Sequence, residues 1–446
     1  MATRLVRRGL IGVAVLVVLV EFCIHLTHSR GDFLLHWEFG RRLRAGVDLY
    51  LNGMHVPYPP AWAVPHAPLS LLPLEVAKAT FLLVSASALA GLVWLLHDLT
   101  RTLAPLKEGR HFWVIAGTLF VASRFIIRDF DDGGQNLVLL ALCWLGVWCV
   151  ARERPWPGGI FLGLAVALKC TSGIFIAYYL LKRQWRMVAS SIVWTVLFSL
   201  SPVLWMGPAE MGRHLEAWAG FVRRGMDQPD PSVGVLGPET LQNMSLRPSL
   251  ARFLLRLPLG HPGRHYIGDL PPESPDRVPH PWSVDFLDLS PTLAGRLIKG
   301  VLLMGVLAVA GLCRGRLERG GSLALLWEAA IMSVLMLLYS PITWGQHCVA
   351  TLPAIYLLFR LLQAGMIPIR GATVFLAAFA FVTVGLNRGF VGKDLALLLG
   401  SYHALTFALV GLVATMFAPR PRGEASQAIP EERSTADEMD PVRSAA

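Results

Sequence analysis

Charged residues and paired cysteines are scarce in this 446-residue sequence. Only 16% of its residues are Asp, Glu, Lys or Arg, whereas 54% are hydrophobic, and the mean hydropathy is +0.52. Soluble domains carry about 25% charged residues, so this composition excludes one large soluble core and indicates a membrane protein. The six cysteines lie mostly inside or beside apolar segments without Cys-x-x-Cys spacing. This argues against a disulfide framework and against a zinc site.

The formal net charge is +10, yet the Lys and Arg residues do not form the continuous stripe that binds nucleic acid. They form short clusters in alternate connections between apolar runs, at 4–8, 101–110, 152–154, 182–186, 314–319 and 360–370. Basic residues in such positions mark cytoplasmic loops and contact lipid head groups. We therefore expect membrane lipids, and no nucleic acid, as partners.

Eleven apolar runs are candidates for membrane helices. They lie at 10–26, 69–96, 112–127, 137–150, 159–181, 188–206, 296–313, 323–339, 347–364, 370–386 and 395–417. The sequence therefore predicts an all-α polytopic membrane bundle of about 11–12 helices in residues 1–417. The first run follows basic residues but lacks a small-x-small cleavage site, so we expect an uncleaved helix rather than a signal peptide.

The run at 159–181 interrupts the alternation of basic loops, because both of its flanks are basic. A single crossing would place one flank outside, whereas two half-helices that meet at 169–173 return both flanks to the cytoplasm. We therefore predict a re-entrant hairpin there, with both termini of the chain cytoplasmic. The segments expected on the outer face are 27–66, 128–136, 207–295, 340–346 and 387–394.

Two segments depart from the membrane-helix pattern. Loop 207–295 is rich in Pro, Gly, His and Asp and is too long for a simple connection, so we expect an extracytoplasmic cap over the bundle. Residues 418–446 lack apolar periodicity and are expected to form a disordered cytoplasmic tail.

The unusual polar clusters all fall in segments expected on the outer face, which points to a single outward-facing site. The first cluster consists of Asp32, Arg41, Arg44, Asp48 and Tyr58. A carboxylate held at the membrane surface is suited to take the proton from a sugar hydroxyl as that hydroxyl attacks an anomeric carbon. The alternative is that Asp32 pairs with Arg30 or Arg41 at the interface.

The second cluster, residues 128–136, places three acids within four positions directly before an apolar helix. A hard cation needs ligands that converge from several directions, and no second acidic cluster accompanies this one, so we expect no metal. Gln135 and Asn136 at the mouth of the helix are suited to hydrogen-bond sugar hydroxyls. The alternative is a helix cap within a solvated loop.

Lys169 is the third feature, because it lies in the middle of an apolar run. A charge there costs about 2.5–3.5 kcal/mol or more unless it is paired or hydrated. An anionic polyprenyl phosphate that arrives from the lipid phase would provide the partner. The alternatives are a snorkelling side chain or an ion pair with a carboxylate of the protein.

Two further clusters complete the candidate site. Residues 340–347 join two apolar runs and contain Trp344, Gln346 and His347, of which the histidine is suited to bind phosphate or to shuttle a proton. Taken alone, a histidine at a helix end is more often a structural hydrogen-bonding residue. The long loop contributes Asn243, Ser245 and Arg247.

In this order along the chain, the clusters resemble the integral membrane glycosyltransferases of the GT-C superfamily, and within it glycosyltransferase family 87, the polyprenyl-phosphate-mannose-dependent mannosyltransferases. The resemblance covers nearly the whole chain up to about residue 417. The elements that carry it are Asp32-Phe33, Gly46 to Tyr50, Tyr58 to Pro60, Gly134 to Asn136, Lys169, Asn243 to Leu246 and Ser340 to His347.

The resemblance implies a glycosyltransferase of the plasma or inner membrane whose active site faces away from the cytoplasm. It implies transfer of a hexosyl group, mannosyl above all, from a polyprenyl-phosphate-sugar to a lipid or glycan acceptor by inverting single displacement. Asp32 is then the catalytic base, Lys169 and His347 contact the donor phosphate, and neither a metal nor another cofactor is required. The other polar residues of the clusters are expected to bind the substrates.

The sequence departs from the family pattern at four positions, which are His36, Ser172, Met244 and Gln346. These changes leave the fold expectation intact and bear on the acceptor and the sugar. Two other functions are alternatives, and the first of them also requires many helices, a broken helix and an intramembrane lysine. One is a transporter or flippase of lipid-linked precursors, which inverted repeats would favour and of which the sequence shows none. The other is a non-catalytic assembly partner that has kept the bundle.

Overall fold

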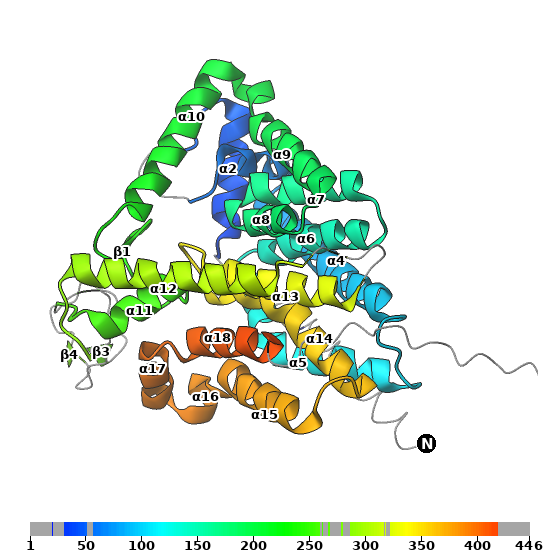
Figure 1. The fold of residues 1–446 in the computed structure, drawn as a ribbon. Helices are drawn as coiled ribbons and strands as arrows, with labels where there is room; N and C mark the ends of the chain where they lie inside the picture. Colours follow the sequence, from blue (N-terminus) through cyan, green and yellow to red (C-terminus); the bar gives the residue numbers. More distant parts are fainter. Residues whose placement is uncertain are drawn as a thin grey trace, which may run out of the picture.

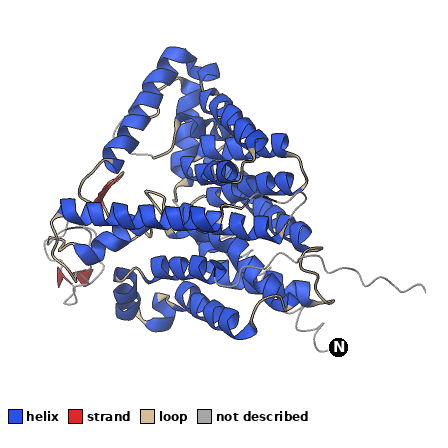
Figure 2. Ribbon diagram, in the orientation of Figure 1, coloured by secondary structure: helices blue, strands red, loops and turns tan. Residues whose placement is uncertain are grey.

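The structure is a computed structural model that describes residues 20, 31–50, 57–258, 261, 266–267, 278–279, 286–315, 317 and 322–417. Almost every described segment is helical, with only short strands (Figure 2). The all-α prediction is therefore confirmed. The first apolar run, apart from Val20, and the tail from residue 418 lie outside the described residues.

The helices of the first half precede a short hairpin. They are α2 (Phe33–Ala45), α3 (Ala63–Leu69), α4 (Leu74–Thr100), α5 (Arg110–Asp131), α6 (Gln135–Ala151), α7 (Pro155–Leu168), α8 (Ile174–Leu181), α9 (Trp185–Leu200) and α10 (Val203–Met226). The 3-10 turns η2 (Pro60–Trp62) and η3 (Cys170–Gly173) lie among them. The hairpin that follows pairs β1 (Val233–Gly234) with β2 (Gly237–Pro238).

The second half is helical apart from one more hairpin. Its helices are α11 (Leu246–Leu254), α12 (Pro291–Leu312), α13 (Leu323–Leu338), α14 (Leu352–Ala364), α15 (Ile369–Ala380), α16 (Arg388–Val391), α17 (Lys393–Ser401) and α18 (Ala404–Phe417). The strands β3 (Tyr266–Ile267) and β4 (Val278–Pro279) pair with each other. A 3-10 turn, η4 (Gly345–Thr351), leads into α14, and a π-helical turn, η5 (Phe381–Gly385), extends α15.

Several helix ends follow from their local sequence. The hydroxyls of Ser290 and Ser322 accept hydrogen bonds from backbone N–H groups in the first turns of α12 and α13, as N-cap residues do. Helices α2 and α14 end at Gly46 and Gly365, with φ angles of 64° and 75°. Glycine adopts this left-handed conformation without steric cost and so terminates a helix.

Fewer helices reach full membrane-spanning length than the eleven runs suggested. Among the described residues four qualify, namely α4, α5, α12 and Gly345–Ala364, and six qualify if each of two bent pairs counts as one span. Five shorter apolar helices accompany them. Several apolar helices end before they reach that length: α6, for example, has 17 residues and is about 25 Å long. The polytopic bundle is confirmed, but several of its helices are partial.

The chain reverses at Lys169, where the re-entrant hairpin was predicted. Lys169 has an extended backbone (φ −148°, ψ 107°) between α7 and η3. Ser190 donates to the carbonyl of Trp156, and Thr195 donates to that of Gly163, so α7 and α9 run parallel. The intervening α8 must therefore run back toward the start of α7. Both basic flanks of this segment thus lie at the same end of the bundle.

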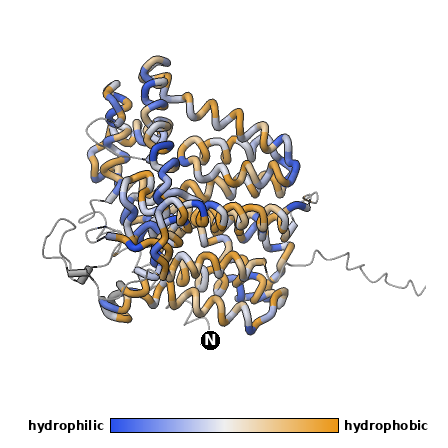
Figure 3. Tube along the Cα trace, turned by 60° about the vertical axis from the view of Figure 1, so that its left-hand side comes forward, coloured by the Kyte–Doolittle hydropathy of each residue, from blue (hydrophilic) through white to orange (hydrophobic). Residues whose placement is uncertain are grey.

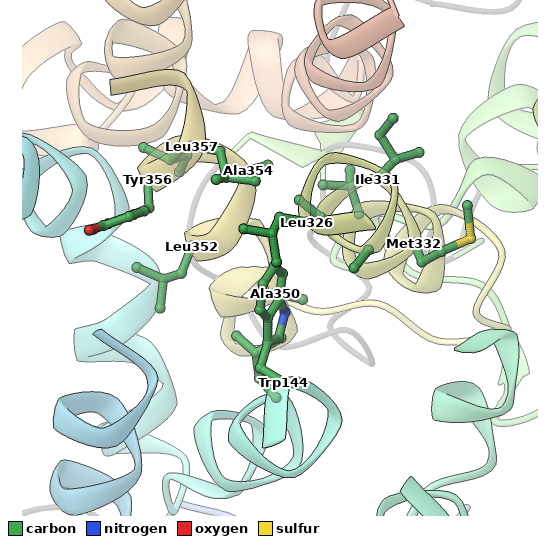
Figure 4. Close-up of a cluster of buried hydrophobic side chains, with 14 of the residues drawn as sticks. Trp144, Leu326, Ile331, Met332, Ala350, Leu352, Ala354, Tyr356 and Leu357 are labelled. Carbon is green, nitrogen blue, oxygen red and sulfur yellow. The ribbon is translucent and has the colours of Figure 1, made fainter. Parts of the chain in front are cut away.

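The hydrophobic core lies where α6, α13, η4 and α14 meet. Figure 4 shows Trp144 of α6 beside Ala350 and Leu326, with side chains of α13 and α14 around them. The indole N–H of Trp144 donates to the hydroxyl of Ser333 on α13. This well-packed centre supports the loop that joins α13 to η4, which belongs to the site described below.

The two ends of the bundle differ in chemistry. At one end Arg152 pairs with Asp98, Arg110 donates to the carbonyl of Gln363, and Lys182 donates to that of Gly315. We call this the basic end. The opposite end carries α2, α10, the β1–β2 hairpin and the break at Lys169, and we call it the site end. Hydrophilic segments gather at the ends of the apolar helices (Figure 3), and α10 runs from α9 to the hairpin (Figure 1).

A buried ion pair joins α8 to α13 near the basic end. Lys182 and Glu328 are 2.5 Å apart, and the side chain of each is 3% exposed. Tyr178 also donates a hydrogen bond to Glu328, over 2.9 Å. A carboxylate at such a site is tolerated because cation and hydroxyl compensate for the loss of water.

Removal of the cation from this pair is expected to destabilise the bundle. Lys182→Met removes the cation beside the buried Glu328 carboxylate and should cost about 3–5 kcal/mol. Thermal unfolding in detergent measures the loss. The double variant Lys182→Met/Glu328→Gln should recover most of it, and a single variant as stable as the parent protein would contradict the argument.

Candidate active site

A cavity of about 340 Å³ lies at the site end. Five segments that are far apart in the sequence line it: the start of α2, the segment before η2, the break after α7, the inner face of α10 with the β1–β2 turn, and the loop after α13. The lining residues are Asp32, Leu35, Pro57, Tyr58, Pro59, Lys169, Cys170, Thr171, Trp218, Val222, Met226, Val235, Leu236, Tyr339, Ser340, Pro341, Ile342, Trp344 and His347.

Asp32 enters this cavity because α2 packs closely on the turn between α5 and α6. A side chain at Gly31 would collide with the backbone of Asp131, and one at Gly133 would lie 3.1 Å from Phe33. The carboxylate of Asp32 makes no hydrogen bond or ion pair with any described residue. Burial raises its pKa, and the positive charges of Arg128 and Lys169 oppose that rise. Asp32 is thus an uncommitted carboxylate at the cavity wall.

Arg41, one of its suggested partners, binds Glu38 over 2.7 Å instead. Arg30, the other, lies outside the described residues.

Lys169 is held by a short chain of polar side chains. Its ammonium donates to Oδ1 of Asn136 over 3.0 Å, and Nδ2 of Asn136 donates to Asp129 over 2.7 Å. The Asp129 carboxylate also accepts the backbone N–H groups of Asn136 and Leu137, and it thereby satisfies the first turn of α6. Within the described residues no carboxylate makes an ion pair with Lys169. The lysine thus presents a positive charge to the cavity.

An aromatic wall lies beside these two charges. Tyr58 stacks on Trp62 with ring centroids 4.3 Å apart, and the Lys169 ammonium lies 6.0 Å from the centre of the Tyr58 ring. The indole of Trp62 donates to Nδ1 of His36 over 2.8 Å. Burial, together with the charges of His66 and Lys169, holds the pKa of His36 well below its usual value. His36 is therefore a neutral member of the wall, with its proton on Nε2.

The loop after α13 forms the facing wall. The backbone N–H of Trp344 donates to Nδ1 of His347 over 3.1 Å. Because Nδ1 is the acceptor, the neutral imidazole carries its proton on Nε2. His347 is therefore suited to donate a hydrogen bond to an anionic oxygen.

Helix α10 and the β1–β2 turn supply an apolar ceiling. Trp218, Val222 and Met226 follow a spacing of four residues, so they share one face of α10. The indole of Trp218 donates to the carbonyl of Pro57 over 3.1 Å, which ties α10 to the segment before η2. The cavity thus has an amphipathic lining, with the polar side chains of Asp32, Lys169 and His347 on its walls and apolar side chains on this ceiling.

The remaining residues that sequence analysis assigned to the site do not line this cavity. Arg41 and Arg44 bind Glu38 and Ser70 respectively, and Asp48 lies 3.4 Å from His214 of α10. Arg247 donates to the carbonyls of Gln228 and Asp230. Four others are buried within the protein: Gln135, Asn243, Ser245 and Gln346. Asn136 acts through Lys169, as described above.

Sequence reasoning missed several cavity residues. Trp218, Thr171 and Tyr339 line the cavity but carry no recognisable motif, and only the position of α10 could have revealed Trp218. Arg128 was noted only as part of an acidic patch, yet it acts on Asp32 while it pairs with Asp132 over 2.9 Å. In the described part of the chain, no three His, Cys, Asp or Glu side chains are grouped as metal ligands.

An apolar groove of about 630 Å³ adjoins the cavity. Helices α8, α12 and α13 line it with residues such as Ile174, Val309 and Met332. The groove and the cavity share Thr171, Tyr339 and Ser340 in their walls. A molecule with a polar head and an apolar tail can therefore occupy both.

A charged cavity that opens onto an apolar groove in a helix bundle is the arrangement expected of an integral membrane enzyme with an amphiphilic substrate. The chain belongs to glycosyltransferase family 87, whose sequence model matches residues 56–341. The expectation from the motifs is thereby confirmed, and the protein is an integral membrane glycosyltransferase. No solved structure gives a significant match.

Three relatives indicate the range of the family. The polyprenol-phosphate-mannose-dependent alpha-(1-2)-phosphatidylinositol mannoside mannosyltransferases of Mycolicibacterium smegmatis and Mycobacterium tuberculosis are each 28% identical, over 72% and 79% of this chain. The alignments cover 66% and 72% of those relatives' own lengths. An alpha-(1->3)-arabinofuranosyltransferase of Corynebacterium glutamicum is 26% identical over 38% of this chain and 41% of its own.

The charge of Arg128 is expected to set the pH range in which Asp32 is ionised. Arg128→Gln removes an attraction that lowers the pKa of Asp32, so the carboxyl should stay protonated to higher pH. If ionised Asp32 is the active form, the acid limb of kcat/KM should move to higher pH. A pH–rate profile tests this. Arg213→Gln, on an exposed arginine of α10 paired with Glu210, should leave the limb in place.

Proposed function

We propose that the protein transfers a mannosyl group from a polyprenyl-phosphate donor to a hydroxyl of a lipid or glycan acceptor, by inverting single displacement on the extracytoplasmic side of the membrane. The observation that carries this proposal is the placement of Asp32 and Lys169 in one cavity that adjoins an apolar groove. A lipid-linked sugar phosphate needs a cation for its phosphate and an apolar surface for its tail, and the acceptor needs a base.

The donor fits the two connected spaces. Its phosphate would lie against Lys169 and His347, which supply a positive charge and an Nε2–H donor, and its isoprenoid tail would follow the groove past Thr171 and Ser340. Helix α12 exposes Leu303, Met304 and Leu307 outside this groove, a surface suited to lipid. The donor could thus enter from the membrane between α8 and α12 without crossing water.

The reaction needs one proton transfer and one displacement. The acceptor oxygen attacks the anomeric carbon from the side opposite the phosphate, and Asp32 takes the hydroxyl proton as the new carbon–oxygen bond forms. The bond between the anomeric carbon and the phosphate oxygen breaks, and polyprenyl phosphate leaves with the electron pair. Lys169 and His347 stabilise the negative charge that develops on the phosphate. Configuration at the anomeric carbon is inverted.

The distribution of basic residues supports an extracytoplasmic site. Arg110, Arg152 and Lys182 mark the basic end, which the positive-inside rule assigns to the cytoplasm. The cavity lies at the opposite end. If the basic end faces the cytoplasm, the cavity therefore faces the extracytoplasmic side.

The relatives' names support the choice of sugar and acceptor. Two of them name a polyprenol-phosphate-mannose donor and a phosphatidylinositol mannoside acceptor, so we propose mannose as the sugar and a membrane glycolipid as the first acceptor to test. A pentofuranosyl donor is the second candidate, because other relatives are arabinofuranosyltransferases.

Replacement of the base is expected to abolish transfer without loss of the donor. Asp32→Asn should lower kcat by about 10²–10⁴-fold, the usual contribution of general-base catalysis. Transfer of labelled sugar to the glycolipid measures kcat, and calorimetric binding of polyprenyl phosphate measures donor affinity, which should stay within about twofold. Asp227→Asn, on an exposed residue at the end of α10, is the matched control. Unchanged transfer by Asp32→Asn would exclude Asp32 as the base.

Partial filling of the groove is expected to weaken binding of the long-chain donor. Ala177→Trp places an indole among the groove residues and should raise the donor KM about tenfold, equivalent to the loss of about two buried methylene groups. The acceptor KM should not change. Ile192→Trp, at an exposed position of α9 that lines neither space, is the control. Equal KM values for both variants would place the tail elsewhere.

A further inference from the structure

Asn243 is buried behind the cavity wall and uses its whole hydrogen-bonding capacity inside the protein. Its Oδ1 accepts the backbone N–H groups of Ser245 and Thr343, over 3.1 Å and 2.9 Å. Its Nδ2 donates to the carbonyl of Pro341 over 2.9 Å and to Oε2 of Glu239 over 2.8 Å. An amide has two donors and two acceptor positions, so none remains for a substrate.

These bonds fix the loop that carries Trp344 and His347. The backbone N–H of Met244 donates to the carbonyl of Thr343 over 2.6 Å, so residues 243 and 244 together bind both backbone groups of Thr343 and the carbonyl of Pro341. Thr343 is fully buried and its hydroxyl donates to the carbonyl of Leu337 at the end of α13. The cavity wall is thus clamped between α13 and the segment before α11.

Glu239 connects the same clamp to the ceiling of the cavity. Its backbone N–H donates to the carbonyl of Ser232 and closes the β1–β2 hairpin, whose turn places Val235 and Leu236 in the cavity. A side chain at Gly234 would collide with the Glu239 carboxylate, so the two are in tight contact. Burial raises the pKa of Glu239 to about 7, while the hydrogen bond from Asn243 and the charge of Arg247 oppose that rise.

We propose that Asn243 and Glu239 are positioning residues that lock the ceiling hairpin to the Pro341–Trp344 loop and so hold Trp344 and His347 in place for the donor phosphate. This inference rests on the proposed function, because the loop matters for transfer only if the phosphate binds there. Neither residue lines the cavity. Their effect on the reaction is therefore indirect, through the wall that they hold.

A swap of hydrogen-bond polarity tests the pair. Asn243→Asp keeps the acceptors for Thr343 and Ser245 but loses both donors and places a second carboxylate beside Glu239. The kcat/KM for the donor should fall about tenfold or more, since small displacements of catalytic groups cost this much. In Asn243→Asp/Glu239→Gln the new amide donates to the new carboxylate, but the carbonyl of Pro341 still lacks its donor, so kcat/KM should rise about threefold above the single variant without reaching the parent value.

Thermal unfolding of each variant separates positioning from stability. A purely structural role lowers the unfolding midpoint but leaves kcat/KM unchanged at temperatures where the variant is folded. A parent-like kcat/KM in Asn243→Asp, or a loss that Glu239→Gln does not reduce at all, overturns the proposal. If Asn243→Asp does not fold, Glu239→Ala and Glu239→Gln form a second matched pair. The alanine variant should lose activity and the glutamine variant should keep it, and equal activity in both overturns the proposal.

The parent protein is assayed first with polyprenyl-phosphate mannose and, in parallel, with a polyprenyl-phosphate pentose. If the parent protein transfers sugar from neither donor, the proposed function is rejected. An active parent with unaffected variants rejects the positioning pair alone, so the two failures are distinguishable.

Discussion

A lysine ammonium placed inside an apolar bundle is the constraint around which the site end is organised. A charge at such a depth costs about 2.5–3.5 kcal/mol or more without compensation, and Lys169 donates only one hydrogen bond to the described protein, to Asn136. The Asp129 carboxylate compensates for the lysine charge only indirectly, because the Asn136 side chain lies between the two charged groups. The remaining demand for negative charge is what a phosphate would satisfy.

The same lysine explains why the helix breaks where it does. Lys169 follows the last residue of α7, and its side chain donates to Asn136 in the first turn of α6 at the point where the backbone leaves the helix. Irregular backbone inside a membrane protein requires a polar lining. Here the lining is the cavity itself, so the break, the buried charge and the site depend on one another.

The amphipathic character of the cavity arises because two groups of helices with different side chains meet there. Lys169 at the end of α7, held by Asn136 and through it by Asp129, brings a positive charge to the cavity, whereas α10 and its hairpin supply an apolar ceiling. The loop after α13 lies between them and is held by Asn243 in addition to its own Ser340 and Thr343 hydroxyls. One consequence is that residues without any chemical role at the reacting centre can control its geometry.

The class of protein, the basic loops, the break at Lys169 and five residues that meet in the cavity could be predicted without a structure; the five are Asp32, Tyr58, Lys169, Trp344 and His347. Hydropathy, charge patterning and short motifs are local properties, and they can be read without coordinates. Which polar residues face the cavity and which face the protein depends on the packing of distant segments. Asn136 and Asn243 belong to the same family pattern as the cavity residues. Their side-chain amides nevertheless bond to Lys169 and Thr343, which lie 33 and 100 positions away in the sequence. Hydrogen-bond partners at that separation are set by packing, and no local pattern encodes them.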